Sequence, residues 1–265
     1  MKIGVVGATG RMGRMVMRQV CATEGCELVG AIDRADVPEA GQDLGTLAGV
    51  APLGLTLGSD APALFKAARV VIDFTVPAAT LAHLELAAAH GCNMVIGTTG
   101  LTAEHDPAFA RAAAKVAIMQ APNMSAGVVL LTALAEQVAR TLGDDYDVEV
   151  LEMHHRHKID APSGTALALG AAAARGRAID FAAASVRTRD GHTGARPRGA
   201  IGFATLRGGD VVGDHSVIFA TEGERIELTH KAQSRVIYAA GAVRAARWTE
   251  GRKPGRYTMR DVLGI

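Results

Sequence analysis

Short apolar segments alternate with helix-length segments in the first part of the chain. The apolar segments predict strands within residues 2–6, 27–32, 70–74, 93–96 and 116–119. They show no in/out alternation of apolar and polar side chains, as in strands that are covered on both faces of a parallel sheet. The segments between them predict helices over residues 11–22, 78–90 and 103–114. The pattern therefore favours an α/β fold with a doubly wound parallel sheet.

The pattern changes near residue 125. One long helix is expected over 125–141, and residues 147–153 then alternate polar and apolar side chains, as a half-exposed strand does. Three β-rich segments follow, at 200–206, 211–220 and 225–229. Residues 234–248 again have a helical pattern. These features predict a second, α+β domain built on a mixed or antiparallel sheet.

Composition limits the classes of function. The 265 residues are 49% apolar and 21% charged, and 28 Lys and Arg against 27 Asp and Glu give a net charge of +1. Because there is no overall basic charge, we expect neither nucleic acid nor a membrane as a partner. No apolar segment approaches the roughly 18 residues of a membrane span. The three cysteines form no C-x-x-C pair, and glycines and arginines interrupt the N-terminal segment, so we expect a cytoplasmic protein without disulfides or structural zinc.

A glycine-rich turn joins the first predicted strand to the first predicted helix. Residues 7–13 read GATGRMG. Backbone N–H groups at a helix N-terminus bind pyrophosphate, and glycines let it approach closely. The spacing is G-x-x-G-x-x-G rather than the commoner G-x-G-x-x-G, so an ordinary turn without a ligand is the alternative. Asp33, twenty residues beyond Gly13, lies at the end of the second strand and favours a dinucleotide site.

Two neighbouring charges bear on the choice of cofactor. The carboxylate of Asp33 can bind ribose hydroxyls, which favours NADH, whereas the guanidinium of Arg34 can bind the 2′-phosphate of NADPH. Together they predict that either cofactor can bind, unless Arg34 is only a surface charge. A GTTG turn at 97–100 follows the fourth strand, at the edge of the sheet where ligands of open α/β folds bind.

The densest group of polar residues is EMHHRHKIDAPSGT at 152–165. Lys158 and the histidines can bind a small polyanion and supply acids near neutral pH, and a helix beginning at Ser163 offers N–H groups to a carboxylate. One alternative is a metal site at His155 and His157, which the neighbouring cations disfavour. Another is a solvated basic loop without a functional role.

Eight segments along the chain carry a more specific signal. They are GATGRMGR at 7–14, VIDFT at 71–75, GTTG at 97–100, APNMSAG at 121–127, HHRHKIDAPSGTA at 154–166, GHTG at 191–194, IGFATLRGGD at 201–210 and MRDVL at 259–263. In these segments the chain resembles the dihydrodipicolinate (4-hydroxy-tetrahydrodipicolinate) reductase family, and the 154–166 block is highly specific. The resemblance implies a homotetrameric NADH- or NADPH-dependent reductase of lysine and diaminopimelate biosynthesis, acting on a small cyclic dicarboxylate.

The resemblance also implies domains and sites. A Rossmann-type dinucleotide-binding domain is expected at 1–125 plus 235–265, and a substrate-binding and oligomerisation domain at 126–234. The implied cofactor-binding residues are Gly7, Ala8, Thr9, Gly10, Arg11, Met12, Asp33, Arg34, Gly97, Thr98, Thr99, Ala121, Pro122, Asn123 and Met124. The implied acid–base pair is His154 and Lys158, and the implied substrate contacts are His155, Gly164 and Thr165. No metal is expected.

Two departures from the family pattern affect the cofactor site. Position 33 is Asp where family members often have Glu, which shortens the reach to the ribose. Val76 stands where some members have an arginine, so one cation near the cofactor is missing.

The implied chemistry assigns roles to the acid–base pair. Hydride from the nicotinamide adds to a conjugated cyclic imine, and an acid must deliver a proton as negative charge develops. We assign this proton to His154 or Lys158, favouring His154, with Lys158 also holding a carboxylate. Two rival functions are a non-catalytic NAD(P)-binding redox sensor and a metal-dependent hydrolase using His154, His155 and His157. The sensor hypothesis leaves the 152–165 cluster without a function, and the hydrolase hypothesis does not account for the glycine-rich turn.

Overall fold

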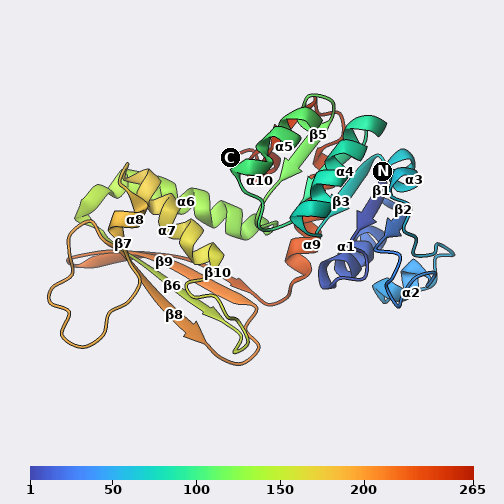
Figure 1. The fold of residues 1–265 in the computed structure, drawn as a ribbon. Coiled ribbons are helices and arrows are strands. Elements are labelled where there is room, and N and C mark those ends of the chain that lie inside the picture. The colour runs from blue at the N-terminus through green and yellow to red at the C-terminus, as the bar shows by residue number, and fades with distance from the viewer. The chain divides into compact units, whose positions relative to one another are not determined.

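The structure, a computed structural model, describes all residues from Met1 to Ile265 (Figure 1). The chain forms two compact units, one of Met1–Ser125 with Val236–Gly264 and the other of Ala126–Arg235. The binding roles expected for domains at 1–125 plus 235–265 and at 126–234 stay a prediction, because compactness alone assigns no ligand.

The first unit is built on a parallel six-stranded sheet in the order β11-β5-β4-β3-β1-β2. Its strands are β1 (Lys2–Val6), β2 (Glu27–Ile32), β3 (Val70–Asp73), β4 (Asn93–Ile96), β5 (Ala117–Gln120) and β11 (Gly255–Tyr257). Its helices are α1 (Arg11–Ala22), α2 (Leu44–Ala48), α3 (Ala61–Ala67), α4 (Pro77–His90), the 3-10 turn η1 (Ala103–His105), α5 (Asp106–Ala113), α9 (Val236–Trp248) and α10 (Met259–Leu263). The strand order reverses at β1 and β3, so this is the predicted doubly wound fold of Rossmann type.

Helices cover both faces of this sheet. Helices α3, α4 and α5 pack in series over one face, where Phe65, Leu84 and Phe109 are fully buried. Helices α1 and α9 pack together over the other. Every residue of β3 is consequently buried, which explains why its sequence shows no alternation.

The second unit is built on a mixed five-stranded sheet in the order β10-β9-β6-β8-β7. Its strands are β6 (Asp147–His154), β7 (Ser185–Val186), β8 (Ile201–Arg207), β9 (Gly213–Thr221) and β10 (Glu224–Ala232). Its helices are α6 (Ala126–Leu142), the 3-10 turn η2 (Gly143–Asp145), α7 (Gly164–Gly176) and α8 (Phe181–Ala184). Strand β9 runs antiparallel to both of its neighbours, β10 and β6, whereas β8 runs parallel to both of its neighbours, β6 and β7.

Strand β6 alternates between the two faces of this sheet. Val148 and Val150 pack under α6 and α7 in the hydrophobic core. Glu152 and His154 continue the same buried row, so that two polar side chains end an otherwise apolar face. The opposite face of the sheet, away from α6 and α7, carries no helix of this unit (Figure 1). The burial of two ionisable side chains marks this end of β6 for functional analysis.

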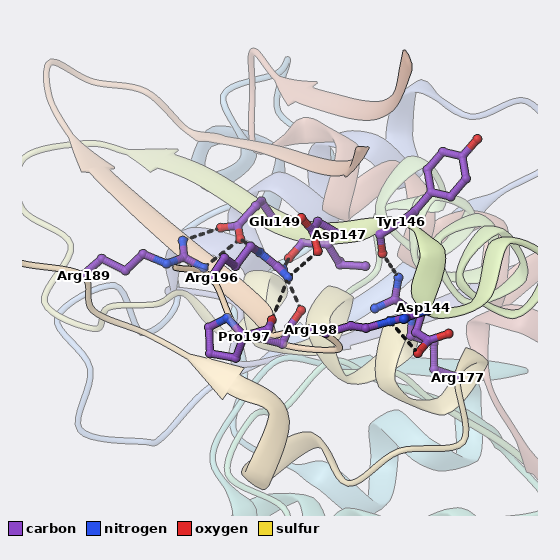
Figure 2. Close-up of polar contacts among 11 residues, drawn as sticks. Asp144, Tyr146, Asp147, Glu149, Arg177, Arg189, Arg196, Pro197 and Arg198 are labelled. Carbon is purple, nitrogen blue, oxygen red and sulfur yellow. Dashed lines mark hydrogen bonds and ion pairs between the residues drawn. The ribbon is translucent and has the colours of Figure 1, made fainter. Parts of the chain in front are cut away.

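Arginines tie the long segment between β7 and β8 to β6 (Figure 2). Arg189 donates to both carboxylate oxygens of Glu149 at 2.8 Å. Arg196 donates to the same carboxylate at 2.9 Å and to Asp147 at 2.6 Å. The Glu149 carboxylate lies over Gly202 of β8, where an added Cβ would be 2.0 Å from Oε2. Two guanidinium groups on one carboxylate thus fix a segment that has little regular secondary structure.

Most predicted elements are present, with shifts of a few residues at their ends. The one helix predicted over 103–114 is instead divided into η1 and α5. Thr102 and His105 form a capping box around η1, and Pro107 begins α5 without a backbone N–H. The two- and three-residue strands β7 and β11 are too short to leave a sequence pattern. None of the helices combines the length and the apolar composition needed to cross a membrane.

Candidate active site

The glycine-rich turn between β1 and α1 leaves backbone donors available. Gly10 is the N-cap of α1 and offers no side-chain cap to the N–H groups of the first turn. A Cβ on Gly13 would lie 2.2 Å from the carbonyl oxygen of Gly7, which itself has a φ of +71°. Only glycine therefore allows this helix to pack so closely on the turn. These features fit the pyrophosphate of a dinucleotide.

Asp33 follows β2, and Thr9 of the glycine-rich turn holds its carboxylate. The N–H and Oγ1 of Thr9 donate to Oδ2 at 2.9 and 2.7 Å, and the N–H of Arg34 donates to Oδ1 at 2.9 Å. Partial burial raises the pKa of Asp33, but the hydrogen bonds from Thr9 and Arg34 outweigh it and lower the pKa overall. The guanidinium of Arg34 is exposed and lies 3.3 Å from Asp36. A fixed anion therefore lies at the expected ribose position.

A cavity of about 380 Å³ lies in the first unit, beside the turns that follow β3, β4 and β5. Its lining residues are Met12, Phe74, Thr75, Gly97, Thr98, Thr99, Pro122, Asn123, Met124 and Tyr238. Seven of the predicted cofactor residues thus share one cavity, whereas Ala121 is buried and does not line it. Phe74 and Thr75 were not among the predicted site residues, although the VIDFT segment contains them. Tyr238 comes from α9, and no sequence signal connected it to this site.

A buried carboxylate orders the floor of this cavity. Asp73, at the end of β3, is fully buried and accepts hydrogen bonds from the N–H and Oγ1 of Thr75 at 2.8 and 2.6 Å. Thr98 Oγ1 donates to the same oxygen at 3.3 Å, and His83 Nδ1 lies 2.9 Å from the other oxygen. Asp73 therefore fixes two hydroxyl groups that line the cavity.

In the second unit, His154 belongs to a buried ionic cluster. Its Nδ1 lies 2.6 Å from Oε2 of Glu152. Arg207 of β8 contacts both oxygens of the same carboxylate, at 2.7 and 3.0 Å, and the N–H of Ser163 donates to it at 3.0 Å. Burial raises the pKa of Glu152, but hydrogen bonds from Arg207, His154 and Ser163 more than compensate, and the pKa is lowered overall. Glu152 is therefore an ionised carboxylate inside the fold.

A second buried histidine lies against His154. The rings of His154 and His215 meet edge to face, 5.0 Å apart between centroids. Burial, followed by the charge of His154, lowers the pKa of His215 to about 4. His215 is consequently neutral near pH 7, and its Nε2 lies 3.1 Å from Ser163 Oγ. Sequence analysis missed both His215 and Arg207, because strand pairing brings them to His154 from distant parts of the sequence.

The loop after β6 carries the other predicted acid. Lys158 Nζ lies 2.7 Å from Asp160 Oδ1, and Lys158 is only partly exposed. The backbone N–H of Lys158 donates to the carbonyl oxygen of His155, which closes a tight turn. Partial burial, then the charge of Arg235, lowers the pKa of His155. This loop therefore carries one ammonium group and one histidine whose neutral form is favoured.

The start of α7 offers a site for a carboxylate. Ser163 is the N-cap, and its Oγ accepts from the N–H of Ala166 at 3.2 Å. A Cβ on Gly164 would meet nothing within 4 Å, so space is open beside the first residue of the helix. Thr165 follows in the same turn. The predicted substrate residues at 164 and 165 thus lie at a helix N-terminus, where anions bind.

Histidines of this region do not form a metal site. No group of three or more His, Cys, Asp or Glu side chains in the structure is arranged to hold an ion. The rings of His155 and His157 are 6.3 Å apart between centroids and are tilted.

A Rossmann-type unit joined to a mixed-sheet unit with a buried cluster of ionisable side chains is an architecture found in NAD(P)-dependent oxidoreductases. The family models described as the N-terminus and the C-terminus of dihydrodipicolinate reductase match residues 1–124 and 127–263. The chain therefore belongs to the dihydrodipicolinate reductase family.

Similar proteins cover the whole chain. A 4-hydroxy-tetrahydrodipicolinate reductase of Afipia carboxidovorans is 54% identical over 265 residues, spanning 100% of this chain and 97% of the relative. Another, of Brucella abortus, is 53% identical over 266 residues, spanning 100% and 99%. A solved structure, the dipicolinate-bound dihydrodipicolinate reductase of Paenisporosarcina sp. TG-14, is 25% identical, with a TM-score of 0.76 over 97% of each chain. The resemblance found in the sequence is confirmed.

Proposed function

We propose that this protein reduces 4-hydroxy-tetrahydrodipicolinate to tetrahydrodipicolinate with NADH or NADPH, in lysine and diaminopimelate biosynthesis. The observation that carries the proposal is the match of both units, at 54% identity over the whole chain, to a reductase of that name. The net reaction takes up a hydride and a proton and releases water. No feature of the structure favours the alternative of a non-catalytic redox sensor.

The first unit holds the dinucleotide in this proposal. The pyrophosphate binds the turn from Gly7 to Met12, and Asp33 and Arg34 face the adenosine ribose. The nicotinamide lies in the cavity lined by Gly97, Thr98 and Thr99, with Pro122 to Met124 and the adjacent Ala121. When bound, the nicotinamide supplies the hydride. Supporting this assignment, the cavity is close in size to ordinary ligand pockets, and Asp73 holds its hydroxyl groups in place.

The second unit binds the dicarboxylate and delivers the proton. One substrate carboxylate accepts hydrogen bonds from the N–H groups of Gly164 and Thr165, and His155 contacts the substrate beside it. Lys158 neutralises a carboxylate, for which it must exchange its present partner Asp160. A dicarboxylate, dipicolinate, is bound to the related reductase of Paenisporosarcina.

His154 is the proton donor in this mechanism. Negative charge develops on the ring of the substrate as the hydride arrives, and a positioned acid lowers that barrier by roughly 10²–10⁴-fold in rate. The carboxylate of Glu152 holds the ring of His154 in place through the contact of 2.6 Å at Nδ1. Lys158 adds a positive charge that stabilises the developing anion.

The assay that tests the function generates the substrate in place. Purified protein is mixed with NADH or NADPH, pyruvate, aspartate semialdehyde and the synthase that condenses them, and nicotinamide absorbance is followed. Oxidation that depends on every component supports the proposal. Binding of both cofactors without oxidation in the complete system would overturn it in favour of the sensor.

We also propose that the protein is a cytoplasmic homotetramer. The uncovered face of the second sheet supports self-association, because Leu206 on that face is 47% exposed and no helix of the unit protects it. Light scattering after size exclusion tests this: a tetramer mass is expected for the natural chain, and Leu206→Asp is expected to dissociate it. A monomer at micromolar concentration would contradict the proposal. The three free cysteines are consistent with a reducing compartment.

A further inference from the structure

We propose that Glu152 is a positioning residue that sets the tautomer of His154, keeping the proton on Nδ1 and leaving Nε2 for the substrate. The kinetic part of this inference rests on the proposed reductase function. Its structural part, the tautomer of His154, does not.

Both oxygens of Glu152 are fully engaged. Oε2 accepts from His154 Nδ1 at 2.6 Å and from Arg207 Nη1 at 2.7 Å. Oε1 accepts from the backbone N–H of Ser163 and from Arg207 Nη2, both at 3.0 Å. Glu152 is 1% exposed, so no solvent competes for these positions. One carboxylate therefore joins the end of β6, the end of β8 and the start of α7.

The charge of Glu152 decides which nitrogen of His154 carries hydrogen. An ionised carboxylate can only accept, so the short contact at Oε2 requires a proton on Nδ1. In the neutral ring Nε2 is then the free basic nitrogen, and in the imidazolium form it is the group that gives the proton up. A carboxylate partner fixes a catalytic histidine in the same way in serine proteases.

The surroundings of Nε2 leave it open for chemistry. A Cβ on Gly213 would lie 3.0 Å from His154 Nε2, so glycine at that position keeps this nitrogen uncrowded. His215 makes no hydrogen bond to it, because Nε2 of His215 lies 3.1 Å from Ser163 Oγ and Nδ1 of His215 has no hydrogen-bond partner in the fold. No hydrogen bond within the fold is made by His154 Nε2.

The same carboxylate connects His154 to the proposed substrate site. Its contact with the N–H of Ser163 fixes the residue that caps α7, immediately before Gly164 and Thr165. Arg207 Nη2 also donates to the carbonyl oxygen of Asp160 at 2.6 Å, which fixes the loop that carries Lys158. A substitution of Glu152 is therefore expected to affect both the proton donor, His154, and the groups proposed to bind the substrate carboxylates.

Glu152→Gln has a predictable orientation. If the new NH2 group stood at Oε1, it would oppose the donors of both Ser163 and Arg207, and the backbone N–H cannot adapt. If it stood at Oε2, it would oppose only one donor of Arg207, because His154 can respond by moving its proton to Nε2. The second arrangement loses fewer hydrogen bonds, so Glu152→Gln is expected to reverse the tautomer.

The test reads the tautomer and the kinetics separately. Nitrogen NMR of histidine-labelled protein, assigned by loss of the signal in His154→Gln, is expected to show Nδ1–H in the natural chain and Nε2–H in Glu152→Gln. In the coupled assay, kcat of Glu152→Gln is expected to fall by about 10²–10⁴-fold with the Kd of NADH unchanged. Glu149→Gln is the matched control, since it changes a carboxylate with two arginine partners on the other face of β6. In this control, the tautomer of His154 and the kcat are expected to equal those of the natural chain.

The outcomes separate this inference from the proposed function. A neutral Nε2–H tautomer in the natural chain overturns the inference, and this measurement stands even if Glu152→Gln does not fold. Full kcat in a folded Glu152→Gln protein overturns it as well. If the tautomer reverses in Glu152→Gln as expected but the natural chain has no reductase activity, the positioning role is supported and the proposed function is rejected.

Discussion

The hydroxyl of Thr9 donates a hydrogen bond of 2.7 Å to Oδ2 of Asp33, and the N–H of Thr9 donates a second one of 2.9 Å to the same oxygen. The glycine-rich turn and the residue that follows β2 are therefore connected before any ligand arrives. This contact keeps the negative charge of Asp33 at the edge of the proposed adenosine site. The neighbouring cation, Arg34, is exposed and lies near Asp36.

A fixed carboxylate predicts a preference for NADH over NADPH. Two like unit charges 4 Å apart repel by about 4 kcal/mol at an effective dielectric constant of 20, and the 2′-phosphate of NADPH carries such charge. Asp33→Asn is expected to raise the ratio of kcat/KM for NADPH to that for NADH by at least about tenfold. Thr9→Val is expected to raise the KM for NADH, because the carboxylate loses one of its anchors. Initial rates with both cofactors measure these ratios, and an unchanged ratio in Asp33→Asn would contradict the role of Asp33.

Asp73 is expected to be important for stability as well as for the cavity. Asp73→Ala removes the acceptor of the N–H of Thr75 and the partner of the His83 ring, and it leaves the hydroxyl of Thr75 with only two long contacts of 3.5 Å, to Val76 and Thr80. Such changes destabilise proteins by about 2–4 kcal/mol, whereas loss of an exposed ion pair costs less than about 1 kcal/mol. Urea unfolding of Asp73→Ala and of the control Asp36→Asn measures the difference. Equal stability of the two variants would show that the buried network contributes nothing.

The sequence predicted the sheet of the first unit and the glycine-rich turn because both are local. Continuous apolar segments such as Val70–Ile72 indicate buried strands, and Gly13 is required by a contact only six residues away. The contacts around His154 are different. Arg207 and His215 reach Glu152 through strand pairing. Arg207 lies in the segment IGFATLRGGD that resembles the family, but nothing in that segment or around His215 indicates a contact with Glu152. Only the paired sheet shows that they share one cluster.

Substitution of either residue of the proposed acid–base pair is expected to slow the reaction without weakening cofactor binding. His154 and Lys158 lie in the second unit, whereas the glycine-rich turn belongs to the first. His154→Ala and Lys158→Ala are therefore each expected to lower kcat by about 10²–10⁴-fold while the Kd of NADH stays within about twofold of natural. Lys158→Ala is also expected to raise KM, since it removes a carboxylate partner. Stopped-flow rates and NADH fluorescence titration measure the two quantities, and weaker NADH binding in either variant would reject the assignment.

The network at Glu149 predicts how stability depends on pH. Burial raises the pKa of Glu149, but hydrogen bonds from Arg189 and Arg196 outweigh it, and the pKa in the folded protein lies below the ordinary 4.5. A carboxyl group whose pKa is lowered by folding stabilises the protein above its unfolded pKa, and this contribution disappears as the pH falls through the folded value. The natural chain is therefore expected to lose more stability than Glu149→Gln between about pH 5 and pH 3. Unfolding free energies from urea titrations at several pH values measure the difference.

Hydrogen exchange is expected to show that the segment between β7 and β8 is less protected in Glu149→Gln at neutral pH, because Arg189 and Arg196 have lost the carboxylate charge that both contact. Parallel stability curves for the two proteins, or unchanged exchange in that segment, would mean that the network in Figure 2 does not stabilise the segment that it contacts.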